Sequence, residues 1–283
     1  MVPARPKTFL ITGVSSGLGR AFAAGALEAG HHVIGTVRRT EQAEAFAALD
    51  RARAHAVILD VTNFAEIAAV VAKAEEDFGP VDVLVNNAGY GQEGALEESS
   101  MDDLQRQFAA NVFGPVAMIK AILPGMRARR SGHIVNVTSM GGFITMPGIS
   151  FYCGSKFALE GISEALGKEV AGFGIRVTAI APGQFRTDWA GRSMDRAPRS
   201  LSDYDAVIDP LRAARLAKNG NQPGDPARAA LALLALVDAP APPVRLFLGA
   251  DALALVDQKL GAMRAEIAAW DELSRSTDFA TTT

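Results

Sequence analysis

Hydrophobic positions along the chain form two alternating kinds of segment. Continuous apolar runs rich in valine and isoleucine lie at 8–12, 32–37, 56–61, 81–86, 133–139, 175–182 and 244–249. Longer stretches with apolar residues at helical spacing lie at about 17–29, 41–51, 63–78, 100–129, 151–172, 225–237 and 251–273. Continuous apolar strands separated by helices are typical of a parallel sheet covered on both faces. The pattern therefore predicts an α/β, doubly wound fold of the Rossmann type, with about seven strands.

One region departs from this rhythm. Residues 185–224 are rich in Arg, Asp, Pro, Gly and Asn, with isolated large apolar residues. A stretch of this length in a compact fold is usually a lid or disorder, and we expect a substrate lid. With neither a repeat nor a linker in the sequence, 1–283 is predicted to be a single domain. The added helix at about 251–273 is amphipathic, and the sequence leaves open whether it covers its own core or a partner.

Composition narrows the function classes. A formal net charge of −3 provides no basic surface for a polyanion, so nucleic acid is not expected as a partner. The longest apolar run, 229–237, is far shorter than the roughly 18 residues of a membrane span, so no membrane association is expected. A single cysteine, Cys153, excludes an intramolecular disulfide and, without an export signal, predicts a cytoplasmic protein. Cys153 itself is either a reactive thiol or, as we favour, a packing residue. The four histidines lack metal-ligand spacing, so no metal site is expected.

A glycine turn follows the first predicted strand. "TGVSSGLG" places Gly13, Gly17 and Gly19 between that strand and the next helix. Glycines at such a turn let backbone N–H groups approach a pyrophosphate at the helix N-terminus. The turn therefore predicts a dinucleotide site.

The end of the second predicted strand bears on which nucleotide binds. An NAD site places a carboxylate here for the ribose 2′-hydroxyl, whereas an NADP site places arginine for the 2′-phosphate. This chain has Arg38 and Arg39, and no acid before Glu41. A solvated strand end is the alternative, but the sequence favours NADP(H).

Tyr152 and Lys156 form a candidate catalytic pair. They lie four residues apart on one predicted helix, so both side chains are on the same face. A nearby ammonium favours a phenolate, so Lys156 is expected to lower the pKa of Tyr152. Ser139, thirteen positions before Tyr152, ends a predicted strand and is a candidate hydrogen-bond donor to substrate or simply a strand-end cap.

These motifs, taken in order, resemble the short-chain dehydrogenase/reductase family over about residues 7 to 250. The matching residues are "TGVSSGLG" at 12–19, Asp60 and Val61, "NNAG" at 86–89, Asn111, Ser139, "YCGSK" at 152–156 and "PGQFRT" at 182–187. The branch with hydroxysteroid and retinol dehydrogenase-like enzymes is the most similar, through "NNAGYG" and the long lid. The resemblance implies hydride transfer between NADP(H) and a carbonyl or secondary alcohol, and a homodimer or homotetramer.

The resemblance also implies residue roles. Tyr152 would be the acid or base, with Lys156, Ser139 and Asn111 as its catalytic partners. The implied cofactor-binding residues are Gly13, Ser15, Ser16, Gly17, Leu18, Gly19, Arg38, Asp60, Val61, Asn87, Ala88, Gly89, Tyr152, Lys156, Pro182, Gly183 and Thr187. Asn86 is as readily a sheet residue, and Thr187 could instead cap a following helix.

Asn111 lies in a predicted helix, four residues before Pro115. Since proline has no N–H, the carbonyl of Asn111 loses its helical partner and can hold a water. The family uses this asparagine to anchor such a water. We therefore expect a distortion of the helix at this point, reinforced by Pro115.

The substrate is expected beyond the carboxyl ends of the strands. Apolar residues that reach this edge favour a lipophilic small molecule, although they could equally pack the lid onto the body: Phe143, Ile144, Met146, Ile149, Phe185 and Trp189. Two other classes stay open: a non-catalytic NADP(H)-binding regulator, and a sugar-nucleotide epimerase or dehydratase of the related extended fold. The retained Tyr152 and Lys156 argue against the first, and the short C-terminal part against the second.

Overall fold

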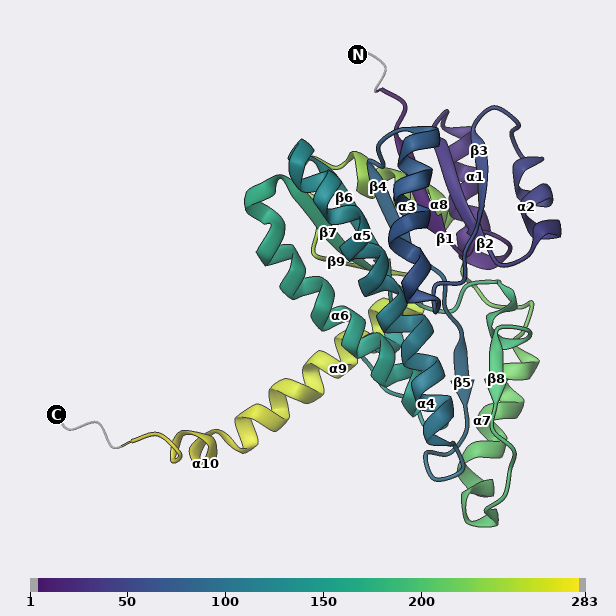
Figure 1. Cartoon of the computed structure of the whole chain (residues 1–283). Coiled ribbons are helices and arrows are strands. Elements are labelled where there is room, and N and C mark those ends of the chain that lie inside the picture. Colours follow the sequence, from purple (N-terminus) through teal and green to yellow (C-terminus); the bar gives the residue numbers. More distant parts are fainter. Residues whose placement is uncertain (1–4, 280–283) are drawn as a thin grey trace.

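A computed structural model describes residues 5–279. Its centre is a parallel sheet of seven strands in the order β3-β2-β1-β4-β6-β7-β9, which confirms the predicted doubly wound fold (Figure 1). The strands are β1 (Thr8–Thr12), β2 (His32–Val37), β3 (Ala54–Ile58), β4 (Val83–Asn86), β6 (Gly132–Val137), β7 (Ile175–Pro182) and β9 (Arg245–Leu248). The strand order reverses between β1 and β4, which opens a crevice at their carboxyl ends.

Helices cover both faces of the sheet, as the apolar strands require. One core cluster lies beneath α1 (Gly17–Glu28), α2 (Thr40–Ala47) and α8 (Pro226–Asp238). The other lies beneath α3 (Phe64–Phe78), α5 (Gly114–Arg129) and α6 (Ser150–Val170). Strand residues supply both clusters alternately: Phe9 and Ile11 face the first, and Leu10 faces the second.

The predicted helix at 100–129 consists of three parts. Ser100 and Asp103 form a reciprocal capping box at the start of α4 (Met101–Phe108). A π-helical turn, Ala109–Phe113, then leads into α5. By length and composition alone, Met101–Arg129 could cross a membrane, with a mean hydropathy of 1.4 in its most apolar window, of which 44% is buried within the protein. Buried core helices meet the same criterion, so this is weak evidence for a span.

The segment expected to be a lid contains regular structure that the sequence pattern did not reveal. Strand β8 (Met194–Arg196) pairs in parallel with β5 (Gly91–Glu93), and α7 (Asp205–Ala217) follows. The buried carboxylate of Glu93 accepts from Arg196 Nε at 3.1 Å and from Arg212 Nε at 3.3 Å. These ion pairs fasten the segment to the end of the crevice.

The C-terminal helix forms as predicted but has a break. Helix α9 (Ala250–Ala269) ends at Trp270, and α10 (Asp271–Arg275) follows. In Figure 1, α9 leaves the body below α6 and extends away from it. Only Ala252 and Val256 of α9 are buried.

Candidate active site

A cavity of about 910 Å³ opens at the carboxyl ends of the parallel strands. It runs from the glycine turn, past the end of β6, to the lid segment. Nearly all the site residues predicted from sequence line it: Gly13, Ser15, Ser16, Gly17, Leu18, Arg38, Asp60, Val61, Asn87, Ala88, Gly89, Ser139, Tyr152, Lys156, Pro182, Gly183 and Thr187. The two others, Gly19 and Asn111, do not line the cavity but contact residues that do: Gly19 lies against Asn87 and Gly13, and Asn111 accepts from the N–H of Tyr90.

The glycine turn has the geometry of a cradle. Gly13 and Gly17 have φ angles of +74° and +60°, which side chains rarely tolerate. A Cβ on Gly19 would lie 2.3 Å from both Asn87 Nδ2 and the carbonyl oxygen of Gly13. Helix α1 begins without a side-chain cap at Ser16 and without an acid in its first turn, so its N–H groups suit an anion. These residues therefore fit a dinucleotide pyrophosphate.

Thr12, which the sequence interpretation missed, joins the glycine turn to the strand beside it. Its Oγ1 accepts from the backbone N–H groups of Asn87 and Ala88, both at 2.9 Å. Asn87 Nδ2 in turn donates to the carbonyls of Thr12 at 3.0 Å and Gly13 at 3.2 Å. Asn87 therefore positions backbone rather than presenting its amide freely to the cavity. The neighbouring Asn86 is a sheet residue, since its amide donates to Asn136 Oδ1 at 2.8 Å.

The end of β2 presents a cation to the cavity. Arg38 is exposed, and its backbone N–H donates to Gln42 Oε1 at 3.3 Å. Across the cavity, Asp60 accepts from the backbone N–H and the hydroxyl of Thr62, at 2.9 and 2.7 Å. Asp60 keeps the loop after β3 in place, and its carboxylate belongs to that turn rather than to Arg38.

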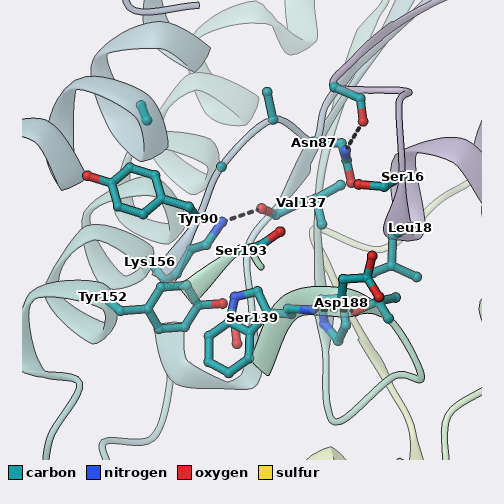
Figure 2. A pocket seen from close by; sticks show the side chains of 18 of the residues that line it. Ser16, Leu18, Asn87, Tyr90, Val137, Ser139, Tyr152, Lys156, Asp188 and Ser193 are labelled. Carbon is teal, nitrogen blue, oxygen red and sulfur yellow. Dashed lines mark hydrogen bonds between the residues drawn. The ribbon is translucent and has the colours of Figure 1, made fainter. Parts of the chain in front are cut away.

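Lys156 reaches the end of β6 from α6. Its Nζ donates to the carbonyl oxygen of Val137 at 2.8 Å, as Figure 2 shows, and lies 5.8 Å from the ring centroid of Tyr152. Burial lowers the pKa of Lys156 to about 8, and the carboxylate of Glu160 opposes that shift. Glu160 is itself buried and is held by Thr138 Oγ1 at 2.5 Å and Arg245 Nε at 2.6 Å.

Tyr152 differs from the sequence expectation. Burial raises the pKa of its phenol, and a hydrogen bond from Ser139 opposes the shift. The expected net lowering of the Tyr152 pKa is therefore wrong for this structure, because desolvation of the phenolate outweighs the attraction of an ammonium whose hydrogen bond goes to Val137. Tyr152 thus keeps its proton at neutral pH, which suits a proton donor.

Ser139 combines the two roles that the sequence left open. Its Oγ accepts from the backbone N–H of Gly141 at 3.0 Å, which caps the short 3-10 turn Met140–Gly142. The same hydroxyl donates toward Tyr152. Fixed by the cap, the Ser139 hydroxyl is oriented toward the phenol.

Asn111 lies in the π-helical turn, at the point where a distortion of the helix was expected. The backbone N–H of Gly114 donates to the carbonyl of Ala109, five residues back. The Asn111 side chain is 1% exposed: Oδ1 accepts from the N–H of Tyr90 at 3.1 Å, and Nδ2 donates to the carbonyl of Tyr90 at 3.0 Å. Nδ2 also lies 3.1 Å from Ser155 Oγ, which donates to the carbonyl of Tyr152 at 2.7 Å. The side chain thus braces two cavity segments, and its amide is occupied by Tyr90 and Ser155.

The loop after β7 forms the far wall. Gly183 donates from its N–H to the carbonyl of Leu248, and a Cβ there would meet Asp251 Oδ1 at 2.3 Å. Asp251 accepts from the N–H of Gln184 at 2.8 Å, a link that the sequence gave no signal for. Thr187 caps the short helical turn that follows it, since its Oγ1 accepts from the N–H of Trp189 at 3.4 Å. Thr187 also lines the cavity.

The apolar lining is partly as predicted. Met146, Ile149, Phe185 and Trp189 line the cavity. Phe143 and Ile144 do not: they pack with Ala252 and Val256 of α9, because the loop after β6 turns toward that helix. Cys153 is buried beside Ile149 and Tyr152, as expected of a packing residue.

The comparisons with known proteins agree with this geometry. The family model described as short chain dehydrogenase matches residues 7–197. The chain is 39% identical to "Oxidoreductase BOA17" of Botryotinia fuckeliana, over 95% of this chain and 98% of that protein. It is 36% identical to a "3-ketodihydrosphingosine reductase" of Bacteroides thetaiotaomicron, over 87% and 88% of the two chains.

Solved structures give the same assignment. A short-chain dehydrogenase from Streptomyces avermitilis superposes with a TM-score of 0.91 at 43% identity, covering 97% of this chain and 99% of that one. The structure described as ElxO with NADP bound has a TM-score of 0.72 at 25% identity, covering 88% and 99%. Since the family model covers more than half of the chain and the relatives align over nearly their whole length, this chain belongs to the short-chain dehydrogenase family of oxidoreductases.

Proposed function

We propose that the protein transfers a hydride between NADP(H) and the carbonyl or secondary alcohol of a lipophilic small molecule. The observation that carries the choice of NADP(H) is the exposed Arg38 at the carboxyl end of β2, on the cavity wall. None of the three residues Arg38, Arg39 and Thr40 is an acid, whereas a site for the ribose 2′-hydroxyl would need one here. The relative solved with NADP bound lends further support.

The residues present would hold the cofactor along one wall of the cavity. Gly13, Gly17 and the N-terminus of α1 suit the pyrophosphate, Arg38 the 2′-phosphate, and Asp60 and Val61 the adenine. When bound, the nicotinamide supplies or accepts the hydride. The chain's own residues supply the proton and the orientation of the substrate.

Tyr152 is the proton donor in this proposal. Its raised pKa keeps the phenol protonated, so it can donate to the oxygen of a reduced carbonyl. Ser139, fixed by Gly141, donates a hydrogen bond to the same substrate oxygen, and the Lys156 ammonium stabilises the phenolate left behind. Oxidation would require the phenolate first, so this environment favours reduction.

The proposed substrate class rests on the cavity wall beyond Tyr152. Met146, Ile149 and Trp189 make that wall apolar, while the exposed Lys218 of the lid segment adds a cation to the lining. A ketone on an apolar body with a polar end fits both features. The relative named as a 3-ketodihydrosphingosine reductase supports reduction of a keto group.

Titration of the full-length protein with NADPH and NADH tests the cofactor, with Arg38→Asp as the variant. We expect tighter NADPH binding, and a preference reduced at least tenfold in Arg38→Asp, since a charge-assisted contact to the phosphate is lost and a repulsive one gained. Arg39→Asp, beside it on the strand end, is the matched control. A preference for NADH in the wild-type protein would overturn the assignment.

Turnover of lipophilic ketones and aldehydes with NADPH tests the reaction. We expect turnover that Tyr152→Phe abolishes while NADPH binding persists. Tight NADPH binding without turnover of any carbonyl would favour a nucleotide-binding regulator instead.

A further inference from the structure

Asp251, in the first turn of α9, forms a hydrogen bond with a distant part of the chain. Its Oδ2 accepts from the backbone N–H of Gln184 at 2.8 Å, and the two residues are 67 positions apart. An acid in a first helical turn is common, because it favours the positive end of the helix dipole. That preference does not require the contact with Gln184, which ties α9 to the loop after β7.

Two glycines leave the space that the Asp251 carboxylate occupies. A Cβ on Gly183 would lie 2.7 Å from Asp251 Oδ2, and a Cβ on Gly249 would lie 2.6 Å from Asp251 Oδ1. Gly249 also has a φ angle of +101°, which side chains rarely tolerate. A side chain at either position would displace the carboxylate. The loop after β7 and the start of α9 are therefore closely fitted to each other around Asp251.

The start of α9 is itself held in place by the body. Ala252, the next residue after Asp251, is 0% exposed and packs against the loop after β6. Strand β9, which leads into α9, pairs with β7, and the carbonyl of Leu248 accepts from the N–H of Gly183 at 2.8 Å. Asp251 provides an acceptor for the next N–H, that of Gln184, at the point where the sheet ends.

The loop that Asp251 holds lines the cavity near the reacting groups. Gly183 and Gln184 are both cavity residues, and β7, which they follow, lies beside β6, which leads to Ser139. Hydride transfer requires the nicotinamide to lie against the carbon that reacts, and therefore close to Tyr152 and Ser139. The loop after β7 is thus at the nicotinamide end of the cavity, and the glycine turn is at the pyrophosphate.

We propose that Asp251 is a positioning residue for the nicotinamide end of the cofactor, a role that rests on the proposed function. By accepting from Gln184, Asp251 keeps the loop after β7 in one conformation before the cofactor binds. Without this acceptor, ordering the loop becomes part of the cost of binding. The glycine turn and Arg38 make no contact with Asp251, so the adenine end of the cofactor should bind as before.

Titration of the full-length protein with NADPH and with 2′-phospho-ADP-ribose, which lacks the nicotinamide ring, tests this role. In Asp251→Ala we expect the dissociation constant to rise about tenfold for NADPH and less than about twofold for 2′-phospho-ADP-ribose. Asp251→Asn keeps the shape and an acceptor oxygen, so it should bind both nucleotides much as the wild-type protein does. Asp257→Ala removes an exposed acid from the same helix and is the matched control, which should change neither constant.

A second change tests the fit between Gly183 and Asp251. Gly183→Ala directs a methyl group at the carboxylate, so it should weaken NADPH binding by displacing Asp251. In the double variant with Asp251→Ala, the displaced group is already absent, so Gly183→Ala should add less than about a twofold loss. Two independent losses of about tenfold would instead multiply to about a hundredfold. Retained binding of 2′-phospho-ADP-ribose would show that each variant folds.

Equal losses of both nucleotides in Asp251→Ala would overturn the proposal, because a purely structural residue would weaken the two ends of the site alike. An unchanged NADPH constant, a loss in Asp251→Asn as large as in Asp251→Ala, or multiplied losses in the double variant would overturn it as well. This outcome is separate from that of the proposed function. If the wild-type protein prefers NADH, the same comparison is made with NADH and ADP-ribose, and it holds whether or not a carbonyl is reduced.

Discussion

The indole of Trp189 lies against the ring of Tyr152, with 5.1 Å between their centroids and 56° between their planes. Trp189 belongs to the lid segment, whereas Tyr152 belongs to α6 beneath the sheet edge. The lid therefore takes part in the burial that raises the pKa of the Tyr152 phenol. We therefore expect this contact to couple substrate binding to proton donation.

Removal of the indole should affect both. In Trp189→Ala we expect kcat/KM to fall roughly two- to twelvefold, as a lost aromatic contact of about 0.5–1.5 kcal/mol implies. Greater exposure should also bring the pKa of Tyr152 back toward its ordinary value, so the oxidative reaction should reach its maximum at a lower pH. Steady-state kinetics against pH measure both effects. Trp270→Ala, which changes the other tryptophan, should leave them unaltered; equal effects of the two changes would exclude a specific role for the ring contact.

Burial lowers the pKa of Lys156 to about 8, and we expect this titration to set the alkaline limit of reduction. Below that pH the ammonium is present and stabilises the developing phenolate; above it, Lys156 loses its charge and kcat should fall. Lys156→Arg keeps its charge at all accessible pH values, so in any activity that remains the decline near pH 8 should disappear. The pH dependence of kcat for carbonyl reduction is the measurement.

Glu160 provides a second check on that titration. Its carboxylate raises the pKa of Lys156, so Glu160→Gln should move the decline to lower pH. A decline that stayed in place in both Lys156→Arg and Glu160→Gln would assign it to another group.

The sequence predicted the sheet because its strands are buried on both sides and leave a continuous apolar run. It predicted the glycine turn, Tyr152 and Lys156 because they are local motifs, whereas most of the other cavity residues followed from the family resemblance. The sequence pattern could not predict β5, β8 and α7, since these are held by long-range ion pairs such as Glu93 with Arg212 rather than by an apolar face.

The sequence also could not predict the burial and hydrogen-bond partners of the site residues. The spacing of Tyr152 and Lys156 predicted their proximity, but not that Nζ would be bound to Val137 while burial governed the phenol. The amide of Asn111 likewise proved to brace Tyr90, a contact between residues 21 positions apart. Hydration and tertiary partners decide such properties, and neither is encoded by residue spacing. NADP(H) preference and the hydroxysteroid/retinol-like branch stay predictions.

Thr12 should prove essential to the cofactor wall. Thr12→Val removes the acceptor of two backbone N–H groups, at Asn87 and Ala88, while keeping the shape of the side chain. We expect a loss of about 1–3 kcal/mol in the free energy of unfolding, because buried donors are left unsatisfied. The dissociation constant for the nucleotide should rise with it, since Asn87 and Ala88 line the cavity. Denaturant unfolding and NADPH titration measure the two, and Thr12→Ser, which keeps the hydroxyl, should lie near wild type.

Pro115 is expected to maintain the π-helical turn that holds Asn111. Because Pro115 cannot donate to the carbonyl of Asn111, that carbonyl lacks its ordinary helical partner, and Pro115→Ala would supply the missing N–H. The ordinary helical bond could then replace the π turn and draw the Asn111 amide away from Tyr90. We expect kcat to fall about tenfold, as general acid–base catalysis supplies at least that much, and the solvent isotope effect on kcat to change.

Pro124 offers a matched control for this change. It also lies within α5, but away from the cavity, so Pro124→Ala removes a helix-interior proline without touching the proton path. Its kcat and isotope effect should equal those of the wild-type protein. If Pro115→Ala behaved in the same way as Pro124→Ala, the carbonyl of Asn111 would have no part in proton transfer, and the π turn would serve only to seat the Asn111 side chain against Tyr90.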